Sequence, residues 1–403
     1  MINCLEKNIK VYYTNIVLAT IAKTMPHAIL TILFLSKGVS ISEIAFIQAL
    51  YSVAMVICEF PSGMMSDLYS RKKVYIISLI TLMVSYIIII SFEGVVYMSI
   101  AWVAYGISTA LATGTLDAEI INQLKEKDGD LQKFFKNSNQ ISLIVSILSV
   151  SIGSLLYYQV ADKMYLISIL LIFANICVVQ LFFVENKINH SNNKPKLATH
   201  IKESFTEVKN NPTLLWFILL FGGLQFFIQT HFQLWQALFL EKGLKEEWFF
   251  IYYIIFQVVM IWSYKVKVEK INLMHLSMLV LMAILLSVVL FFSNFPAIDV
   301  TIYLSICFIG FVINYFSTFH FSKLVSKEKI SSLTSLSSTI TRIFSFLVLG
   351  ISTLLLNEMN IKLVYMINFV VAFSISITVL LIIKMIDKKT NVAECSTYSN
   401  DNL

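Results

Sequence analysis

Uncharged stretches of about twenty residues or more recur along this chain of 403 residues. A helix needs about 20 predominantly apolar residues to cross the hydrocarbon core of a bilayer. Clean stretches cover 74–92, 137–161, 164–184, 210–240, 271–298, 300–322 and 363–383, and less clean candidates lie around 12–36, 41–66, 95–122, 248–264 and 331–357. We therefore predict an all-α membrane protein with twelve transmembrane helices.

The composition supports the same class of protein. Hydrophobic residues make up 58% of the chain and charged residues only 13%, whereas soluble domains carry about 25% charged residues. The first apolar stretch is long, lacks a small-residue cleavage site and contains Lys23, so we expect it to remain as the first helix. The five cysteines show no Cys-x-x-Cys spacing, and we predict neither a disulfide framework nor a metal site.

Basic residues are distributed unevenly between the two sides of the predicted helices. With the amino terminus inside, the cytoplasmic segments collect most of them, including Lys7, Lys10 and the cluster Arg71 to Lys73. The outer loops hold only Lys37, Lys163, Lys242, Lys245 and Lys362. Because cytoplasmic loops carry the excess of Lys and Arg, we expect both termini in the cytoplasm. Topology then explains the net charge of +6, and we predict no nucleic-acid partner.

A long polar segment divides the predicted helices six and six. The predicted parts are an N-terminal six-helix bundle at 1–184, a cytoplasmic linker at 185–212, a C-terminal six-helix bundle at 213–386 and a cytoplasmic tail at 387–403. Within the linker, residues 199–210 form a candidate surface helix.

The two halves resemble each other in sequence. Residues 35–57, LSKGVSISEIAFIQALYSVAMVI, align without gaps on residues 240–262, LEKGLKEEWFFIYYIIFQVVMIW, and both segments carry Leu-x-Lys-Gly in the same predicted loop. Six-helix repeats of the same orientation imply a pseudo-twofold axis along the membrane normal, with a substrate site between the halves near the midplane.

Residues 59–73, EFPSGMMSDLYSRKK, end the second predicted helix with a distinctive motif. The stretch from Gly63 to Lys73 resembles the loop 2–3 signature of the major facilitator superfamily, Gly-x-x-x-Asp-Arg-x-Gly-Arg-Arg/Lys. The preceding EFPSG resembles the Glu-x-Pro-Ser/Thr-Gly version found in bacterial drug-efflux-like members. This sequence departs from the signature at Leu68 and Ser70, where the family has Arg and Gly.

The resemblance implies two pseudo-symmetric six-helix bundles, a bacterial cell membrane as the location, and a conformational latch on the cytoplasmic side. Asp67 would meet the start of the eleventh helix, where free N–H groups and the helix dipole attract an anion. Arg71 would pair with Asp117 or Glu119 at the cytoplasmic end of the fourth helix. The residues assigned to the latch are Gly63, Asp67, Arg71, Lys72, Asp117 and Glu119.

Polar and ionisable side chains inside the predicted helices are the candidates for the transport site, because such residues are costly in hydrocarbon and usually face a cavity. Those expected to line a substrate cavity are Lys23, Thr24, His27, Gln48, Trp102, Thr113, Gln225, Gln229, Gln233, Asn314 and Arg342. Glu59 and His27 are the candidates for proton coupling. Two structural alternatives stay open, in which Glu59 pairs with Lys23 or Arg342, and His27 is a buried side chain with one hydrogen bond.

A face of small residues in the fifth predicted helix has a simpler explanation. Ser142, Ser146, Ser149 and Gly153 recur at helical spacing, which lets another helix come close. We expect a packing seam there.

Motifs that would make the chain an enzyme or an ATP-driven pump do not occur. Gly-x-x-x-x-Gly-Lys-Ser/Thr, His-Glu-x-x-His and Gly-x-Ser-x-Gly are all absent from the sequence, and we expect no cofactor. The sequence predicts a proton-coupled exporter of lipophilic or amphiphilic small molecules, such as antibiotics, that works as a monomer in the lipid bilayer. The alternatives are an importer or uniporter of a small nutrient, and a non-transporting scaffold or immunity protein on the same fold.

Overall fold

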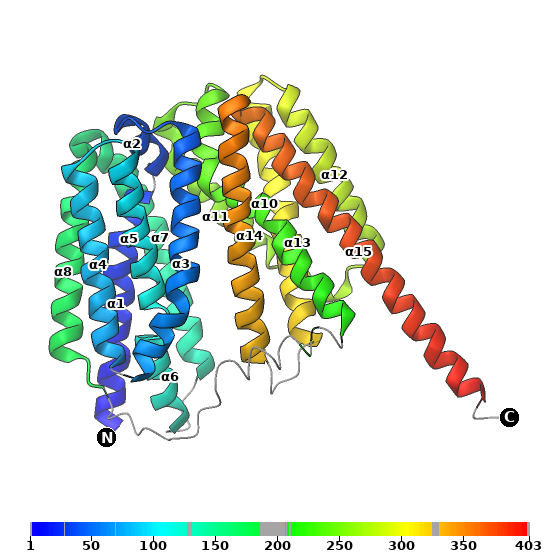
Figure 1. The fold of residues 1–403 in the computed structure, drawn as a ribbon, viewed down its shortest axis with the longest axis horizontal. Helices are drawn as coiled ribbons and strands as arrows, with labels where there is room; N and C mark the ends of the chain where they lie inside the picture. The colour runs from blue at the N-terminus through cyan, green and yellow to red at the C-terminus, as the bar shows by residue number, and fades with distance from the viewer. Residues whose placement is uncertain are drawn as a thin grey trace. The chain divides into compact units, whose positions relative to one another are not determined.

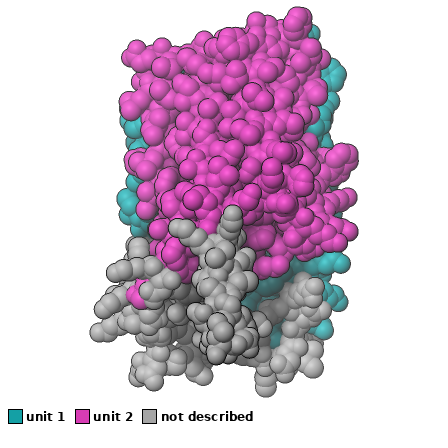
Figure 2. All heavy atoms as spheres, turned by 90° about the vertical axis from the view of Figure 1, so that its right-hand side faces the viewer, with its two compact units in different colours: residues 1–191, 245–255 teal, residues 192–244, 256–403 magenta. Residues whose placement is uncertain are grey.

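The protein is described by a computed structural model that covers residues 2–27, 29–68, 70–126, 131–185, 206, 208, 211–324 and 330–400. All regular elements in this part of the chain are helices. The chain divides into two compact units, residues 1–191 with 245–255, and residues 192–244 with 256–403, which Figure 2 distinguishes by colour. The sequence boundary between them, at 191/192, falls inside the predicted linker.

Unit 1 contains the N-terminal helices, drawn from blue to green in Figure 1. They are α1 (Ile2–His27), α2 (Leu30–Ser36), α3 (Ile41–Leu68), α4 (Arg71–Ser91), α5 (Val95–Ala112), α6 (Leu116–Glu126), α7 (Leu131–Val160), the short 3₁₀ helix η1 (Ala161–Lys163) and α8 (Met164–Phe182). Local sequence sets several of these starts. Ser40 and Glu43 form a reciprocal capping box before α3, in which the Ser40 amide donates to Glu43 at 2.8 Å.

Unit 2 contains most of the C-terminal helices. They are α10 (Pro212–Glu241), η2 (Glu246–Trp248), α11 (Phe249–Ser263), η3 (Val268–Lys270), α12 (Leu273–Phe292), α13 (Pro296–Leu324), α14 (Ile330–Glu358) and α15 (Ile361–Asn400), although η2 and the first part of α11 group with unit 1. Helix α10 starts with Pro212, whose missing N–H costs nothing at the first helical position. Helix α15 continues through most of the predicted tail, and its membrane-length part ends at Ile386.

The predicted all-α membrane fold is confirmed. In the described residues, ten helical segments are long and apolar enough to cross a membrane, and α1 with α2 makes an eleventh when the bent pair is counted as one span. The remaining predicted span, 248–264, corresponds to α11, which has 15 residues. At 1.5 Å per residue it is roughly 22 Å long, shorter than the ~30 Å hydrocarbon core. The predicted surface helix at 199–210 lies almost entirely outside the described residues.

Two predicted spans are interrupted rather than continuous. The first consists of α1 and α2, and Pro26 lies at the end of α1, where a proline disfavours continuation of the helix. The fourth consists of α5 and α6, separated at Gly114, whose φ of +70° lies in the left-handed region that favours glycine. Helical periodicity therefore does not carry from Trp102 in α5 to Asp117 in α6.

The same helix pairings occur in both units, which supports the internal repeat. In unit 1, α1 packs against α7 and α8, and α4 packs against α5 and α8. In unit 2, α10 packs against α14 and α15, and α12 packs against α13 and α15. These four pairings correspond between the units, whereas the packing of α3 against α5 has no comparable counterpart between α11 and α13.

The Leu-x-Lys-Gly segments end a helix in the same way in each unit. Gly38 and Gly243 have φ values of +76° and +74°. The Gly38 amide donates to the Leu35 carbonyl at 3.1 Å and the Val39 amide to the Phe34 carbonyl at 3.0 Å. At the end of α10, the Gly243 amide donates to the Leu240 carbonyl and the Leu244 amide to the Phe239 carbonyl, each at 2.9 Å. Both ends are Schellman motifs, in which a left-handed residue lets the chain satisfy the last carbonyls of the helix.

The lysine of each segment is buried and paired with an acid. Lys37 Nζ lies 2.8 Å from Asp162 Oδ2, and Lys242 Nζ lies 3.1 Å from Asp299 Oδ2. Lys242 also donates to the carbonyls of Leu290 and Ser293 at the end of α12. Burial lowers the pKa of Lys242, and the hydrogen bond and charge of Asp299 oppose that shift.

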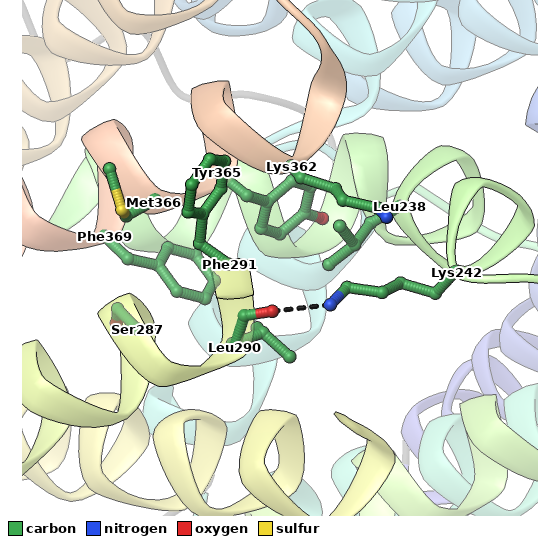
Figure 3. Close-up of a pocket in the computed structure, with 9 residues that line it drawn as sticks. All are labelled: Leu238, Lys242, Ser287, Leu290, Phe291, Lys362, Tyr365, Met366 and Phe369. Atoms are coloured by element: carbon green, nitrogen blue, oxygen red, sulfur yellow. Dashed lines mark hydrogen bonds between the residues drawn. The ribbon is translucent and has the colours of Figure 1, made fainter. Parts of the chain in front are cut away.

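Lys242 sits at the edge of a crevice in unit 2. Figure 3 shows its ammonium group reaching the carbonyl of Leu290, with Tyr365, Lys362 and Phe369 from α15 nearby. The crevice has no space for a water-sized sphere, so this region is packed structure rather than a ligand pocket.

The predicted seam of small residues packs against α1. A Cβ atom at Gly153 would collide with the carbonyl oxygen of Met25, because α7 and α1 approach closely at this point. Ser149, one turn earlier on the same face, is also buried. Glycine is required here by lack of space rather than by its backbone conformation.

Gly153→Ala is expected to destabilise unit 1 by about 1–3 kcal/mol, because the added methyl group must push α1 away from α7. Gly350→Ala is the matched control, since nothing lies within 4 Å of a Cβ atom at that position of α14. The control is expected to be neutral or slightly stabilising. The thermal midpoint Tm of each purified variant measures the difference, and equal values for the two would contradict the seam.

Lys242→Met is expected to destabilise the protein by about 3–5 kcal/mol, because it leaves Asp299 buried without its cation. The double variant Lys242→Met/Asp299→Leu should recover most of this loss. Lys245→Met, an exposed lysine three residues later, is the control. Unfolding of the purified variants tests the pair, and a double variant no more stable than the single one would disprove the compensation.

Candidate functional site

The start of α4 is a cluster of polar contacts built from the predicted latch motif. Ser70 caps α4 by accepting from the Lys73 amide at 3.1 Å, and its hydroxyl donates to the Glu185 carboxylate. Lys72 Nζ donates to the carbonyls of Gln180 and Phe183, each at 2.8 Å. These carbonyls belong to the end of α8, where a cation also meets the negative end of the helix dipole. The motif thus joins the start of α4 to the end of α8.

Arg71 forms the ion pair predicted for it, and Glu119 is the partner. Arg71 Nη1 lies 3.0 Å from Glu119 Oε2, and both side chains are largely buried, with 15% and 6% exposed. Glu119 Oε1 accepts from Gln123 at 2.9 Å, and Gln123 accepts from Asn8 of α1 at 3.0 Å. The contacts therefore link α4, α6 and α1.

Of the three other residues assigned to the latch, only Asp117 is described with its side chain. Asp117, the alternative partner of Arg71, is half-buried and has no ion pair within the described part of the chain. Gly63 lies within the last turns of α3, and the side chain of Asp67 is outside the described residues. The contact of Asp67 with the eleventh helix stays a prediction.

The polar stripe predicted on the first helix is present on α1. Thr24 donates to the Thr20 carbonyl at 2.8 Å. Lys23 and His27 are half-buried, and neither forms an ion pair or a hydrogen bond with any described residue. The His27 ring lies 5.5 Å from that of Tyr105 and 5.9 Å from that of Trp102.

Gln48 and Trp102 contact each other in the core of unit 1. The Trp102 indole donates to Gln48 Oε1 at 3.0 Å, and the two residues are only 3% and 2% exposed. Thr113, in contrast, is exposed at the end of α5, where its hydroxyl donates to the Thr109 carbonyl at 3.0 Å. The role of Gln48, Trp102 and Thr113 in lining a substrate cavity stays a prediction.

In unit 2, the polar stripe of α10 forms a small network with α14. Gln229 Nε2 donates to Gln225 Oε1 and to Ser345 Oγ, both at 3.0 Å, and Ser345 Oγ lies 2.9 Å from Gln225 Oε1. Gln233, Asn314 and Arg342 are half-buried on α10, α13 and α14, and their place in a substrate cavity stays a prediction.

Glu59 lies inside α3, nine residues before the helix ends at Leu68. At 1.5 Å per residue this is roughly 13 Å from the end, so the carboxyl group belongs to the membrane-length part of the helix. Its side chain is half-buried. The position fits either an ion pair or a proton-binding group.

Sequence reasoning missed Ser70, Glu185 and the Asn8–Gln123 contact. Ser70 was recognisable, because serine directly before a helix is a preferred N-cap. Glu185 carried no such signal, since its partner lies 115 residues earlier and only the approach of α8 to α4 brings the two together.

The fold and these contacts define a multi-pass membrane protein with two helical units that repeat each other's packing. A family model described as Major Facilitator Superfamily matches residues 13–347. The chain belongs to the major facilitator superfamily, and it is a membrane transporter rather than an enzyme.

Solved structures of transporters share the fold. A crystal structure of a mutant of the nucleoside transporter NupG matches with a TM-score of 0.74 and 14% identity, covering 93% of this chain and 99% of that one. NupG itself matches with a TM-score of 0.69 and 14% identity, covering 96% and 99%. A bacterial homolog of the human lysosomal transporter Spinster, inward-facing and unoccupied, matches with a TM-score of 0.66 and 12% identity, covering 94% and 95%. No curated protein sequence matches the chain.

Glu119→Gln is expected to lower stability by about 1–3 kcal/mol, because Arg71 loses the charge that accepts its hydrogen bond. Asp117→Asn, two residues away on the same helix, is the matched control and should leave stability nearly unchanged. Thermal unfolding of both purified variants provides the measurement. The Arg71–Glu119 assignment fails if Asp117→Asn is the more damaging of the two.

Proposed function

We propose that this transporter is a proton-coupled exporter of lipophilic or amphiphilic organic molecules that works by alternating access. The observation that carries the proposal is Glu59, a half-buried carboxyl group inside a membrane-length helix. A carboxylate at this depth is costly, so such groups are paired or take part in proton or substrate movement, and the proposal assigns Glu59 to proton movement. A proton crossing the membrane releases about 2.3 kcal/mol per 100 mV, which is sufficient to drive export.

The chemistry of unit 1 supports an amphiphilic substrate. His27, Tyr105 and Trp102 put one titratable ring next to two large aromatic surfaces. Apolar walls with a few placed polar groups suit organic molecules that carry both kinds of surface. His27 is the second proton-coupling candidate in this proposal.

The polar contacts at the start of α4 act as the conformational latch in this proposal. Arg71 and Glu119 hold α4 against α6, and Lys72 holds α4 against α8. Asp67 would add the contact that keeps the cytoplasmic side closed when the protein faces outward. The protein would sit in a bacterial cell membrane with both termini in the cytoplasm, and would work as a monomer.

Uptake of a small polar nutrient is the second candidate. The Gln225–Gln229–Ser345 group favours it, because uncharged amide and hydroxyl groups match the hydrogen-bonding edges of polar solutes such as nucleosides. NupG, which has the same fold, is a nucleoside transporter. Direction of flux separates the two candidates.

In energised cells, the wild-type protein is expected to lower the accumulation of a fluorescent amphiphilic dye, and an uncoupler should abolish this effect. Cells that make Glu59→Gln should accumulate as much dye as cells without the protein, because glutamine cannot bind and release a proton. Glu93→Gln, a glutamate whose side chain is 75% exposed, is the matched control and should behave like the wild type.

The same cells are given radiolabelled uridine to test uptake. Dye exclusion that persists in Glu59→Gln would remove Glu59 from the coupling mechanism. Faster uridine entry without dye exclusion would favour the importer.

A further inference from the structure

Lys23 and His27 differ from the other basic side chains of unit 1 that are buried or half-buried. Lys37 and Arg71 pair with carboxylates, and Lys72 donates to the carbonyls of α8. Lys23 and His27 have no acidic partner and no hydrogen bond within the described residues, and His27 Nε2 is buried. Two unsatisfied nitrogen donors therefore lie one helical turn apart on α1.

The position of these side chains around α1 indicates what they meet. The buried residues of α1 include Asn8, Asn15 and Ala22, which face α7 and α8. At 3.6 residues per turn, Lys23 and His27 lie about 80–120° around the helix from the centre of that buried face. Thr20 and Thr24 share this other side. Hydrocarbon would not solvate such a surface, so it must meet water, a polar solute or polar groups of the protein.

A cluster of aromatic rings borders His27. Trp102 and Tyr105 stack on each other with ring centroids 5.3 Å apart and planes 12° apart, and the His27 ring contacts both. Tyr51 of α3 extends the cluster, with its ring 5.6 Å from that of Tyr105. Gln48 fixes the Trp102 indole by accepting a hydrogen bond from its N–H. The cluster is fixed by unit 1 itself.

These features together select one chemical class of solute. A carboxylate, sulfonate or phosphate group can accept from Lys23 and His27, which supplies the counter-charge that the described part of the protein lacks there. Trp102 and Tyr105 are only 2% and 6% exposed and therefore form a packed apolar wall beside His27, which suits the apolar part of an amphiphilic solute. A cationic solute would meet Lys23 with the same charge and no compensating acid among the described residues.

We infer that Lys23 and His27 bind the acidic group of the transported solute, so that the substrates of this transporter are amphiphilic organic anions. This inference rests on the proposed export function and names the class of molecule that the site takes. Lys23 provides an amine that a bound acidic group would hold in its charged form, and His27 provides a second donor beside the buried aromatic rings.

Two probes with the same ring and opposite charge test the inference, namely 1-naphthylacetate and 1-naphthylmethylammonium. Binding to the purified full-length protein is measured by calorimetry, and flux is measured in proteoliposomes with an imposed proton gradient. Lys23→Gln should weaken binding of the carboxylate at least about tenfold, the loss of one charge-assisted hydrogen bond. Lys23→Arg should keep affinity within a few-fold. Lys163→Gln, an exposed lysine outside α1, is the control and should change nothing.

Several outcomes overturn the inference. They are failure of the wild type to bind the carboxylate, a preference for the ammonium probe, and equal carboxylate affinity in the wild type and Lys23→Gln. Failure of the export proposal gives a different result, because proton-driven flux of both probes is then absent while Lys23-dependent binding remains. If proton-driven flux is instead equal for the two probes, the export proposal is supported and the anion site is disproved.

Discussion

A backbone amide inside a bilayer has no water to bond with, and this constraint determines how the chain is organised. Helices satisfy their own N–H and C=O groups except at the ends, so each end must be placed in water or given a partner. The structure meets this need with particular residues. Gly38 and Gly243 turn the chain so that it caps its own helix, Ser70 caps the start of α4, and Lys72 and Lys242 donate to the last carbonyls of neighbouring helices.

The fold could be predicted because its signals are local or repetitive. Apolar runs predict spans, and the Leu-x-Lys-Gly segments predicted a repeat whose backbone geometry and helix pairings the two units share. Even the interruptions had local causes, since Pro26 and Gly114 both disfavour a continuous helix. Their effect on facing side chains was missed because a periodicity count assumes an unbroken helix.

The site was harder to predict because its contacts join residues that are distant in the sequence. Helical spacing could place Lys23, Thr24 and His27 on one side of α1, but it could not show that Gln48 and Trp102 satisfy each other in the core. Arg71 had two candidate acids two residues apart, and only the geometry of α6 selects Glu119. Glu185 had no visible role until α8 brought it to the start of α4. Side-chain chemistry shows what a residue can do, whereas packing decides what it meets.

The two lysine pairs also constrain the order in which the units can assemble as the chain is made. Lys242 and Asp299 are 57 residues apart in the sequence, so this pair can form once the α12–α13 hairpin has been made. Lys37 and Asp162 are 125 residues apart, and Asp162 directly precedes α8, the last long helix of unit 1. Until Asp162 has been made, the charge of Lys37 has only the exposed Glu93 nearby. The same motif can therefore form its ion pair early in one unit, whereas in the other the pair can form only after α7 has been made.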